Sequence, residues 1–308
     1  MRSLTRRRFL ETIGATAIAT GLAGRAQSRT RLILLGTAGG PRPKIDRAAS
    51  SQAIVVGDRI YIVDCGDGVA RRMTEAGLDL TRLVRVFITH HHSDHNADYG
   101  TLLLLAWASG LQTRVGTHGP PPLAAMTEAF FAQNAFDIAT RMADEMRVPL
   151  RPLIVPHETS AGGLIVEENG VRVTAALVNH PPVVPAFAYR FDTPDRSIVI
   201  SGDTTRSDAL QTLARDADVL VHEALFRPGI ERTAARVANA ERLLEHILAS
   251  HTTVEDVARL ATAARVRTLV LSHLVPADDP AVTDADWIAA ASPHFDGEII
   301  VGRDLLEI

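Results

Sequence analysis

Residues 86–96 read VFITHHHSDHN, and they join the end of an apolar run to a group of metal-binding side chains. The run ends at Thr89, and four such side chains follow within six positions: His90, His92, Asp94 and His95. Imidazole and carboxylate groups are ligands that divalent metals such as zinc accept. On an extended loop alternate residues point the same way, so His90 and His92 can reach one metal. Asp94 and His95 then turn toward a second.

Three later apolar runs also end in a metal-binding residue. They are VTAALVNH, which ends at His180, SIVISGD, which ends at Asp203, and TLVLSH, which ends at His273. Short apolar runs of this kind are typical of buried strands. An accidental cluster of polar residues in one loop would not be matched by three further strand ends, so the sequence predicts a metal centre.

The ordered set of seven residues resembles the metal-binding signature of the metallo-β-lactamase superfamily. Its motif His-x-His-x-Asp-His stands here at residues 90–95. The resemblance implies an α/β fold, the four-layer αββα sandwich, with two divalent ions, Zn²⁺ by preference and Mn²⁺ or Fe permitted. It assigns one ion to His90, His92 and His180, a second to Asp94, His95 and His273, and a bridging role to Asp203.

Within this superfamily the chain resembles most the branch that contains ribonuclease Z and its arylsulfatase-like relatives. Five segments in the order of that branch carry the resemblance: GTAGGPRPKIDRAASS at 36–51, DCGDG at 64–68, SGDT at 201–204, HEA at 222–224 and SHTT at 250–253. It implies hydrolysis by a metal-bridging hydroxide, with Asp94 as the proton acceptor. Glu223 and His251 would orient and protonate the leaving oxygen. Alternatively, both only support the ligands through hydrogen bonds.

Residues 1–26 have the pattern of an export signal. TRRRFL at residues 5–10 precedes an apolar region that ends near Leu22, and small residues follow up to Ala26. The pattern resembles a twin-arginine signal, which predicts a periplasmic or secreted protein with one domain over residues 27–308. The apolar region is shorter than the roughly 20 residues of a membrane span, so no stable membrane anchor is expected. The alternative is a basic N-terminal helix of a cytoplasmic protein.

Composition and charge favour one large acidic domain. The chain has 308 residues, of which 46% are hydrophobic, and its single cysteine, Cys65, can form no internal disulfide. Residues 1–26 carry five arginines and one glutamate, so their removal changes the formal net charge from −4 to −8. A protein that binds nucleic acid normally has a basic stripe, and none is visible in the sequence.

Two further observations argue against a tRNA substrate. Ribonuclease Z holds the RNA end with a Pro-x-Lys-x-Arg-Asn loop, which Pro43, Lys44 and Arg47 match only in part because Ala48 replaces the Asn. His180 and Asp203 are 23 residues apart, too few for the tRNA-binding arm that some of these ribonucleases insert there. We therefore expect a small-molecule ester as the substrate and whole tRNA as an unlikely partner.

The expected activity is an exported dinuclear hydrolase of phosphodiester or sulfate esters. Three alternatives remain open. The same site could hydrolyse carbon esters, lactones or β-lactams. A cytoplasmic protein could be a tRNA 3′-processing endonuclease, and a chain without activity could be a metal-binding or interaction module.

The remaining pattern predicts alternating strands and helices. Residues 31–36, 51–57 and 59–66 read as strands, with a hairpin turn at Gly57 and Asp58. Residues 100–109 are apolar on most faces and predict a buried helix. Residues 122–147 also read as helical; they form either a lid over the metal centre or an element for packing or for a homodimer.

Overall fold

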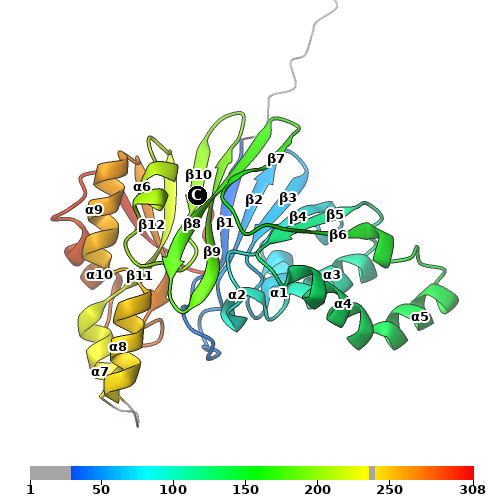
Figure 1. Ribbon diagram of the computed structural model, residues 1–308, viewed down its shortest axis with the longest axis horizontal. Helices are drawn as coiled ribbons and strands as arrows, with labels where there is room; N and C mark the ends of the chain where they lie inside the picture. Colours follow the sequence, from blue (N-terminus) through cyan, green and yellow to red (C-terminus); the bar gives the residue numbers. More distant parts are fainter. Residues whose placement is uncertain (1–28, 236–239) are drawn as a thin grey trace, which may run out of the picture.

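The computed structural model describes residues 29–235 and 240–308. Two β-sheets lie face to face, and helices cover the outer side of each (Figure 1). This is the predicted four-layer αββα sandwich. The predicted signal at residues 1–26 lies outside the described residues, so export stays a prediction. Among the described residues, no helix combines the length and the apolar character that crossing a membrane requires.

The first sheet contains six strands in chain order. The first three are antiparallel, with the predicted turn at Gly57 and Asp58 between the second and third, and the last four are parallel. The strands are β1 (Arg31–Gly36), β2 (Ser51–Val56), β3 (Arg59–Val63), β4 (Leu83–Phe87), β5 (Val115–Gly119) and β6 (Ile154–Glu158).

The second sheet contains seven strands in the order β13-β12-β11-β10-β9-β8-β7. The pairs among β7, β8, β9 and β10 are antiparallel, and those among β10, β11, β12 and β13 are parallel. The strands are β7 (Gly163–Glu168), β8 (Val171–His180), β9 (Val183–Asp192), β10 (Ser197–Ile200), β11 (Val219–Leu225), β12 (Thr268–Val275) and β13 (Glu298–Val301). Strands β8, β10, β11 and β12 therefore run in one direction and end at one edge.

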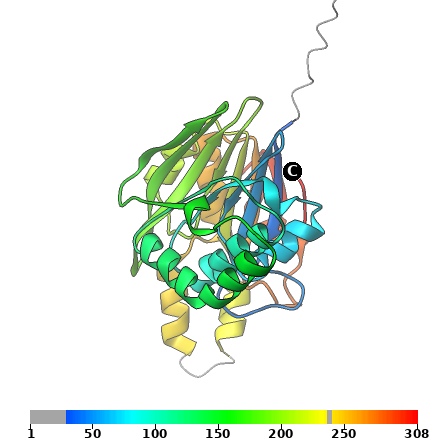
Figure 2. The same ribbon diagram turned by 90° about the vertical axis from the view of Figure 1, so that its right-hand side faces the viewer.

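The helices form two groups, one in each half of the chain. The first group is α1 (Val69–Glu75), α2 (Ser93–Asn96), α3 (Tyr99–Ala108), α4 (Leu123–Gln133) and α5 (Ala135–Asp144). The second is α6 (Asp208–Leu213), α7 (Arg227–Ala234), α8 (Ala240–Ser250), α9 (Val254–Ala264) and α10 (Asp284–Ala291). Figure 2 shows α7 and α8 projecting beyond the edge of the sandwich.

Three apolar cores fill the spaces between the layers. Alternate residues of each strand face opposite sides of a sheet, so Phe87 faces the other sheet while Val86 faces the helices. Phe87 packs edge-on against Phe191 of β9, with ring centroids 5.2 Å apart. On the outer faces, α3 buries Trp107 and α9 buries Leu260. The metal loop after β4 is thereby fixed between two packed layers.

Residues 122–147 form two helices and not one continuous helical segment. The first, α4, buries Leu123, Thr127, Phe130 and Phe131, whereas α5 has no buried residue. The helices meet at Asn134, whose side-chain amide donates to the Phe130 carbonyl. Phe136 on α5 is 85% exposed. In this chain α4 is a packing element, and α5 extends away from the body (Figure 1).

Candidate metal centre

The candidate residues meet because their strands end at the same edge of the sandwich. His90 and His92 follow β4, Asp94 and His95 lie in α2, and His180 is the final residue of β8. Asp203 comes three residues after β10, and His273 lies in β12. Opposite β11 the register of β12 shifts at His273, whose φ of 42° marks a bulge. A bulge re-aims the side chain, here toward the other ligands.

Three histidines form the first group of candidate ligands. His92 Nδ1 lies 3.0 Å from His90 Nε2 and 3.1 Å from His180 Nε2. Asp203 Oδ2 lies 3.8 Å from the Nε2 atoms of both His90 and His180. His90 and His180 are buried and His92 is partly exposed. The four side chains could hold one metal ion.

The second group shares Asp203 with the first. His273 Nε2 lies 3.2 Å from both Asp94 Oδ2 and Asp203 Oδ2. His95 Nε2 lies 3.3 Å from Asp203 Oδ1. All four side chains of this group are buried. A shared carboxylate between two groups is the arrangement that the predicted bridging role of Asp203 requires.

Asp64 at the end of β3 supports both groups, although the sequence analysis gave it no role. Its carboxylate accepts hydrogen bonds from the Thr89 backbone N–H at 2.8 Å and from His95 Nδ1–H at 2.7 Å. It also accepts from the Thr89 hydroxyl, at 2.9 Å. The hydroxyl proton is thus used, so the contact of 3.0 Å between Thr89 Oγ1 and His90 Nδ1 needs the imidazole as donor. The Nε2 atoms of His90 and His95 are therefore left free to bind metal.

Backbone groups fix two more ligands. The Ser250 carbonyl accepts from His180 Nδ1–H at 2.8 Å, which again leaves Nε2 free. The Gly40 backbone N–H donates to Asp94 Oδ2 at 2.9 Å. Beside it, a Cβ on Gly39 would lie 2.9 Å from the His273 ring, so only glycine permits this close approach.

Glu223 and His251 form a pair next to the two groups. Glu223 Oε2 accepts from His251 Nδ1–H at 2.8 Å, and Glu223 Oε1 accepts from the Thr204 backbone N–H at 2.8 Å. His251 Nδ1 lies 4.0 Å from Asp203 Oδ2. Glu223 is buried, whereas His251 is partly exposed and can face a substrate. The geometry suits a general acid that is oriented by a carboxylate.

Burial and charge set different protonation states for the histidines. Burial lowers the pKa of His180 to about 4 and also lowers the pKa of His90. Both rings are therefore neutral near pH 7, as metal ligands must be. Burial also disfavours the His251 imidazolium, but the charge and hydrogen bond of Glu223, together with the charges of Asp203 and Asp94, outweigh it and raise the pKa of His251 to about 9. His251 can therefore hold a proton where His180 cannot.

The residues present fit a pair of divalent cations. His95 Nε2 and Asp203 Oδ1 are buried and have no hydrogen-bond partner among the described residues. A buried polar atom without a partner is costly unless an ion satisfies it. Imidazole and carboxylate ligands without thiolate suit Zn²⁺ and also permit Mn²⁺ or Fe. The identity of the ions stays a prediction.

All seven predicted ligands and the predicted pair are brought together, while His118 and His157 lie elsewhere, on β5 and β6. His118 and His157 stack on neighbouring strands with ring centroids 4.8 Å apart, and burial lowers the pKa of His118 to about 3. Asp64 is the main residue that the sequence analysis missed. Its signal was present, because DCGDG places a carboxylate where a buried strand ends. The catalytic and metal-binding roles of the assembled residues stay predictions.

A family comparison accounts for this arrangement. The family model described as "Beta-lactamase superfamily domain" matches residues 59–274, which include all of the candidate ligands. The chain belongs to this superfamily. It has the metallo-β-lactamase fold and is a metal-dependent hydrolase, as the sequence predicted.

Individual members of the superfamily are similar over nearly the whole chain. "Ribonuclease Z" of Mycobacterium bovis (strain BCG / Pasteur 1173P2) is 34% identical over 277 residues, covering 89% of this chain and 96% of the relative. A metallo-β-lactamase fold protein from Bacillus subtilis superposes with a TM-score of 0.66 at 20% identity, covering 91% of this chain and 98% of its own. The short form of human tRNase Z gives 0.64 at 21% identity, covering 90% and 98%. At these identities the two structures support the fold alone.

These relatives correct the predicted partner. A small-molecule ester was expected and whole tRNA was considered unlikely, whereas the curated relative is named a ribonuclease and the human protein a tRNase. That prediction is wrong, and its physical reason fails as well. The match covers 96% of the mycobacterial ribonuclease, so a protein of nearly this length carries that name, and a short interval between His180 and Asp203 is no obstacle.

Proposed function

We propose that this chain is a metal-dependent ribonuclease that cleaves a phosphodiester bond at the 3′ side of a tRNA precursor. One observation carries the proposal. Two ligand groups share Asp203, and the Glu223–His251 pair lies beside that shared carboxylate, with His251 Nδ1 4.0 Å from Asp203 Oδ2. The 34% identity to a ribonuclease Z supports RNA as the substrate class.

The chain would hold the two ions through its two ligand groups. His90, His92 and His180 would hold one, Asp94, His95 and His273 the other, and Asp203 both. When bound, two such ions lower the pKa of water and neutralise charge on a phosphoryl group. Asp64 binds His95 Nδ1 directly and reaches His90 Nδ1 through the Thr89 hydroxyl, so the Nε2 atoms of both histidines would face the ions.

The protein's own groups would move the protons. Asp94 Oδ2 is held by the Gly40 N–H and lies beside His273, so it can accept a proton from the attacking water. His251 would give its proton to the departing ribose oxygen. Glu223 keeps the His251 ring in place, because its other oxygen is fixed by the Thr204 N–H.

Cleavage of a precursor tRNA with a 3′ trailer tests this function. Purified, metal-reconstituted protein is expected to release the trailer at one position, and the Asp94→Asn variant is expected to do so far more slowly. A mature tRNA of the same body serves as the uncleaved control. If the reconstituted protein binds two metal ions but leaves the precursor intact, the proposed substrate is wrong.

We also propose that residues 1–26 are a twin-arginine signal and that residues 27–308 form the exported domain. The support is TRRRFL ahead of a short apolar region. Replacing Arg6 and Arg7 by lysine is expected to leave the protein in the cytoplasm. Cell fractionation with N-terminal sequencing tests this proposal. If the unmodified protein is found in the cytoplasm with an intact N-terminus, export is contradicted. The outcome does not affect the test of RNA cleavage in vitro.

A further inference from the structure

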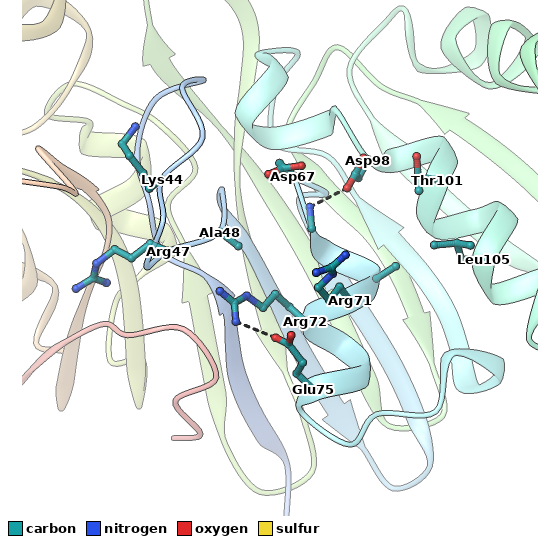
Figure 3. Close-up of a pocket in the computed structure, with 12 residues that line it drawn as sticks. Lys44, Arg47, Ala48, Asp67, Arg71, Arg72, Glu75, Asp98, Thr101 and Leu105 are labelled. Atoms are coloured by element: carbon teal, nitrogen blue, oxygen red, sulfur yellow. Dashed lines mark hydrogen bonds and ion pairs between the residues drawn. The ribbon is translucent and has the colours of Figure 1, made fainter.

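A cavity of about 500 Å³ lies beside the metal loop, between the loop at residues 44–48, helix α1 and helix α3 (Figure 3). Four cationic residues from two separate segments line it: Lys44, Arg47, Arg71 and Arg72. A smaller cavity shares Lys44, Arg47 and Asp67 with it and reaches Asp94. The larger cavity is therefore the next space along the surface from a candidate metal ligand.

Arg47 uses one end of its guanidinium, Nη1, to hold its own loop. Its Nη1 donates to the Thr37 hydroxyl at 2.6 Å and to the Gly302 carbonyl at 2.7 Å. The next residue is fixed as well, since the Ala48 N–H donates to Asp304 at 2.6 Å. In this chain Arg47 therefore ties its loop to the C-terminal segment.

Arg71 and Arg72 are neighbours on α1 with different surroundings. Arg72 pairs with Glu75 at 2.8 Å and with Asp304 at 3.2 Å. Arg71 is exposed, and within the described part of the chain its guanidinium makes no hydrogen bond or ion pair. Figure 3 shows the ion pair of Arg72, with Arg71 on the same helix and Lys44 across the cavity.

Three carboxylates also line the cavity: Asp67, Glu75 and Asp98. Glu75 is paired with Arg72, and Asp98 accepts from the Gly68 backbone N–H at 2.7 Å. Lys44 uses one of its three N–H groups on the Arg42 carbonyl, at 2.6 Å. Asp67 is exposed on the side that leads to Asp94. Among the described residues, Arg71 thus keeps its whole guanidinium free, Lys44 keeps two N–H groups, and Asp67 makes no hydrogen bond or ion pair.

We propose that this cavity binds one nucleotide of the RNA strand that continues from the metal centre, with Arg71 as its main phosphate ligand. The inference rests on the proposed ribonuclease function and deepens it. A guanidinium can donate two parallel hydrogen bonds to a phosphate, which the point charge of Lys44 cannot. Asp67 can accept a hydrogen bond from a ribose 2′-hydroxyl, the group that distinguishes RNA from DNA.

The test combines a variant with a shortened substrate. Precursor RNAs are trimmed by one nucleotide at a time on each side of the cleavage site, and kcat/KM is measured for the unmodified protein and for Arg71→Ala. For the unmodified protein, removal of the nucleotide that fills the cavity is expected to lower kcat/KM on the order of 10-fold. Arg71→Ala should show that loss already with the long RNA and no further loss on trimming.

Salt dependence gives a second readout. In a His251→Ala background, which slows cleavage during the measurement, Arg71→Ala is expected to reduce the slope of log affinity against log salt by about 0.7, the value for one phosphate of a single strand. Arg71→Lys should restore this slope but only part of the affinity, because the charge is kept and the paired hydrogen bonds are lost.

Arg114→Ala is the matched control. Arg114 is also exposed, but it precedes β5 and so lies at the opposite edge of the sheet from the metal centre. It should match the unmodified protein in both experiments. If Arg71→Ala loses the same factor as the unmodified protein at every trimming step, the nucleotide site is refuted while the ribonuclease function stands. If the unmodified protein cleaves no RNA, the proposed function itself has failed.

Discussion

The two ligand groups share Asp203, but they differ in how firmly the fold holds them. His92 in the first group is partly exposed, and every member of the second group is buried. Asp64 binds His95 of the second group directly, whereas it reaches His90 of the first group through the Thr89 hydroxyl. The two groups thus differ in the burial of their ligands and in how directly Asp64 supports them, although the same sequence motif contributes to both.

This difference in burial suits the two groups to different tasks, which are retention of an ion and access for a substrate. The buried second group is suited to keep its ion, because its ligands have few ways to rearrange. The first group has an open side at His92, which can admit a substrate or exchange its ion more easily. We therefore expect the ion of the first group to be released first by a chelator.

Loss of the shared ligand Asp203 should remove the ions of both groups. Asp203→Ala removes the carboxylate that lies within 3.8 Å of His90 and 3.2 Å of His273, so both ions should be lost and activity should fall to background. Metal analysis of the purified variant after reconstitution checks this. Retention of one full equivalent would show that Asp203 serves one group only.

The acid role of His251 is the next largest effect, and it should leave both groups occupied. His251→Ala is expected to lower turnover by about 10²–10⁴, the usual size of a general-acid contribution. An aryl phosphodiester, whose departing oxygen needs no proton, should lose far less than RNA. Equal losses on both substrates, or loss of metal, would place His251 among the supporting residues.

Replacement of Asp64 should affect the two ions differently, because Asp64 binds His95 directly and reaches His90 only through Thr89. Asp64→Asn is expected to weaken the second ion by about 10–100-fold, as removal of a ligand's hydrogen-bond partner commonly does, and the first ion less. Stepwise titration with a chelator measures both. Thr89→Val is the matched variant, because it removes the hydroxyl beside His90 and should weaken the first ion alone. The same order of sensitivity in both variants would contradict this distinction.

The smallest expected effect concerns the open group. The Ser250 hydroxyl donates to the Pro181 carbonyl at 2.6 Å, next to the ligand His180. Ser250→Ala removes one hydrogen bond and should weaken the first ion by about five-fold, with the second unchanged. Thr233→Ala, which removes a hydroxyl from α7 that donates to the Gly229 carbonyl at 3.0 Å, should change neither ion.

The candidate ligands could be predicted because strand ends are visible in sequence. Apolar runs end at His180, Asp203 and His273, and parallel strands place their carboxyl ends at one edge. The helix at residues 100–109 was predicted for the same reason, since local apolar patterns indicate burial.

Contacts between distant segments could not be read in this way. The bond from Asp64 to His95 and the attachment of Arg47 to Gly302 depend on how loops fold over the edge. The cavity cations come from two segments, so no basic stripe appears in the sequence. The break at Asn134 was hidden because α4 and α5 form one continuous helical pattern.

Strand β1 is the outermost strand of its sheet, yet its free side is covered. The Leu32 N–H and carbonyl pair with Ile308, and the Leu34 N–H and carbonyl pair with Leu306 and Leu305. Exposed strand edges recruit other chains into continuous sheets. Residues 305–308 therefore cover the backbone groups through which β1 could pair with another chain. A variant without these residues is expected to aggregate through the exposed edge of β1, even if every metal ligand stayed in place.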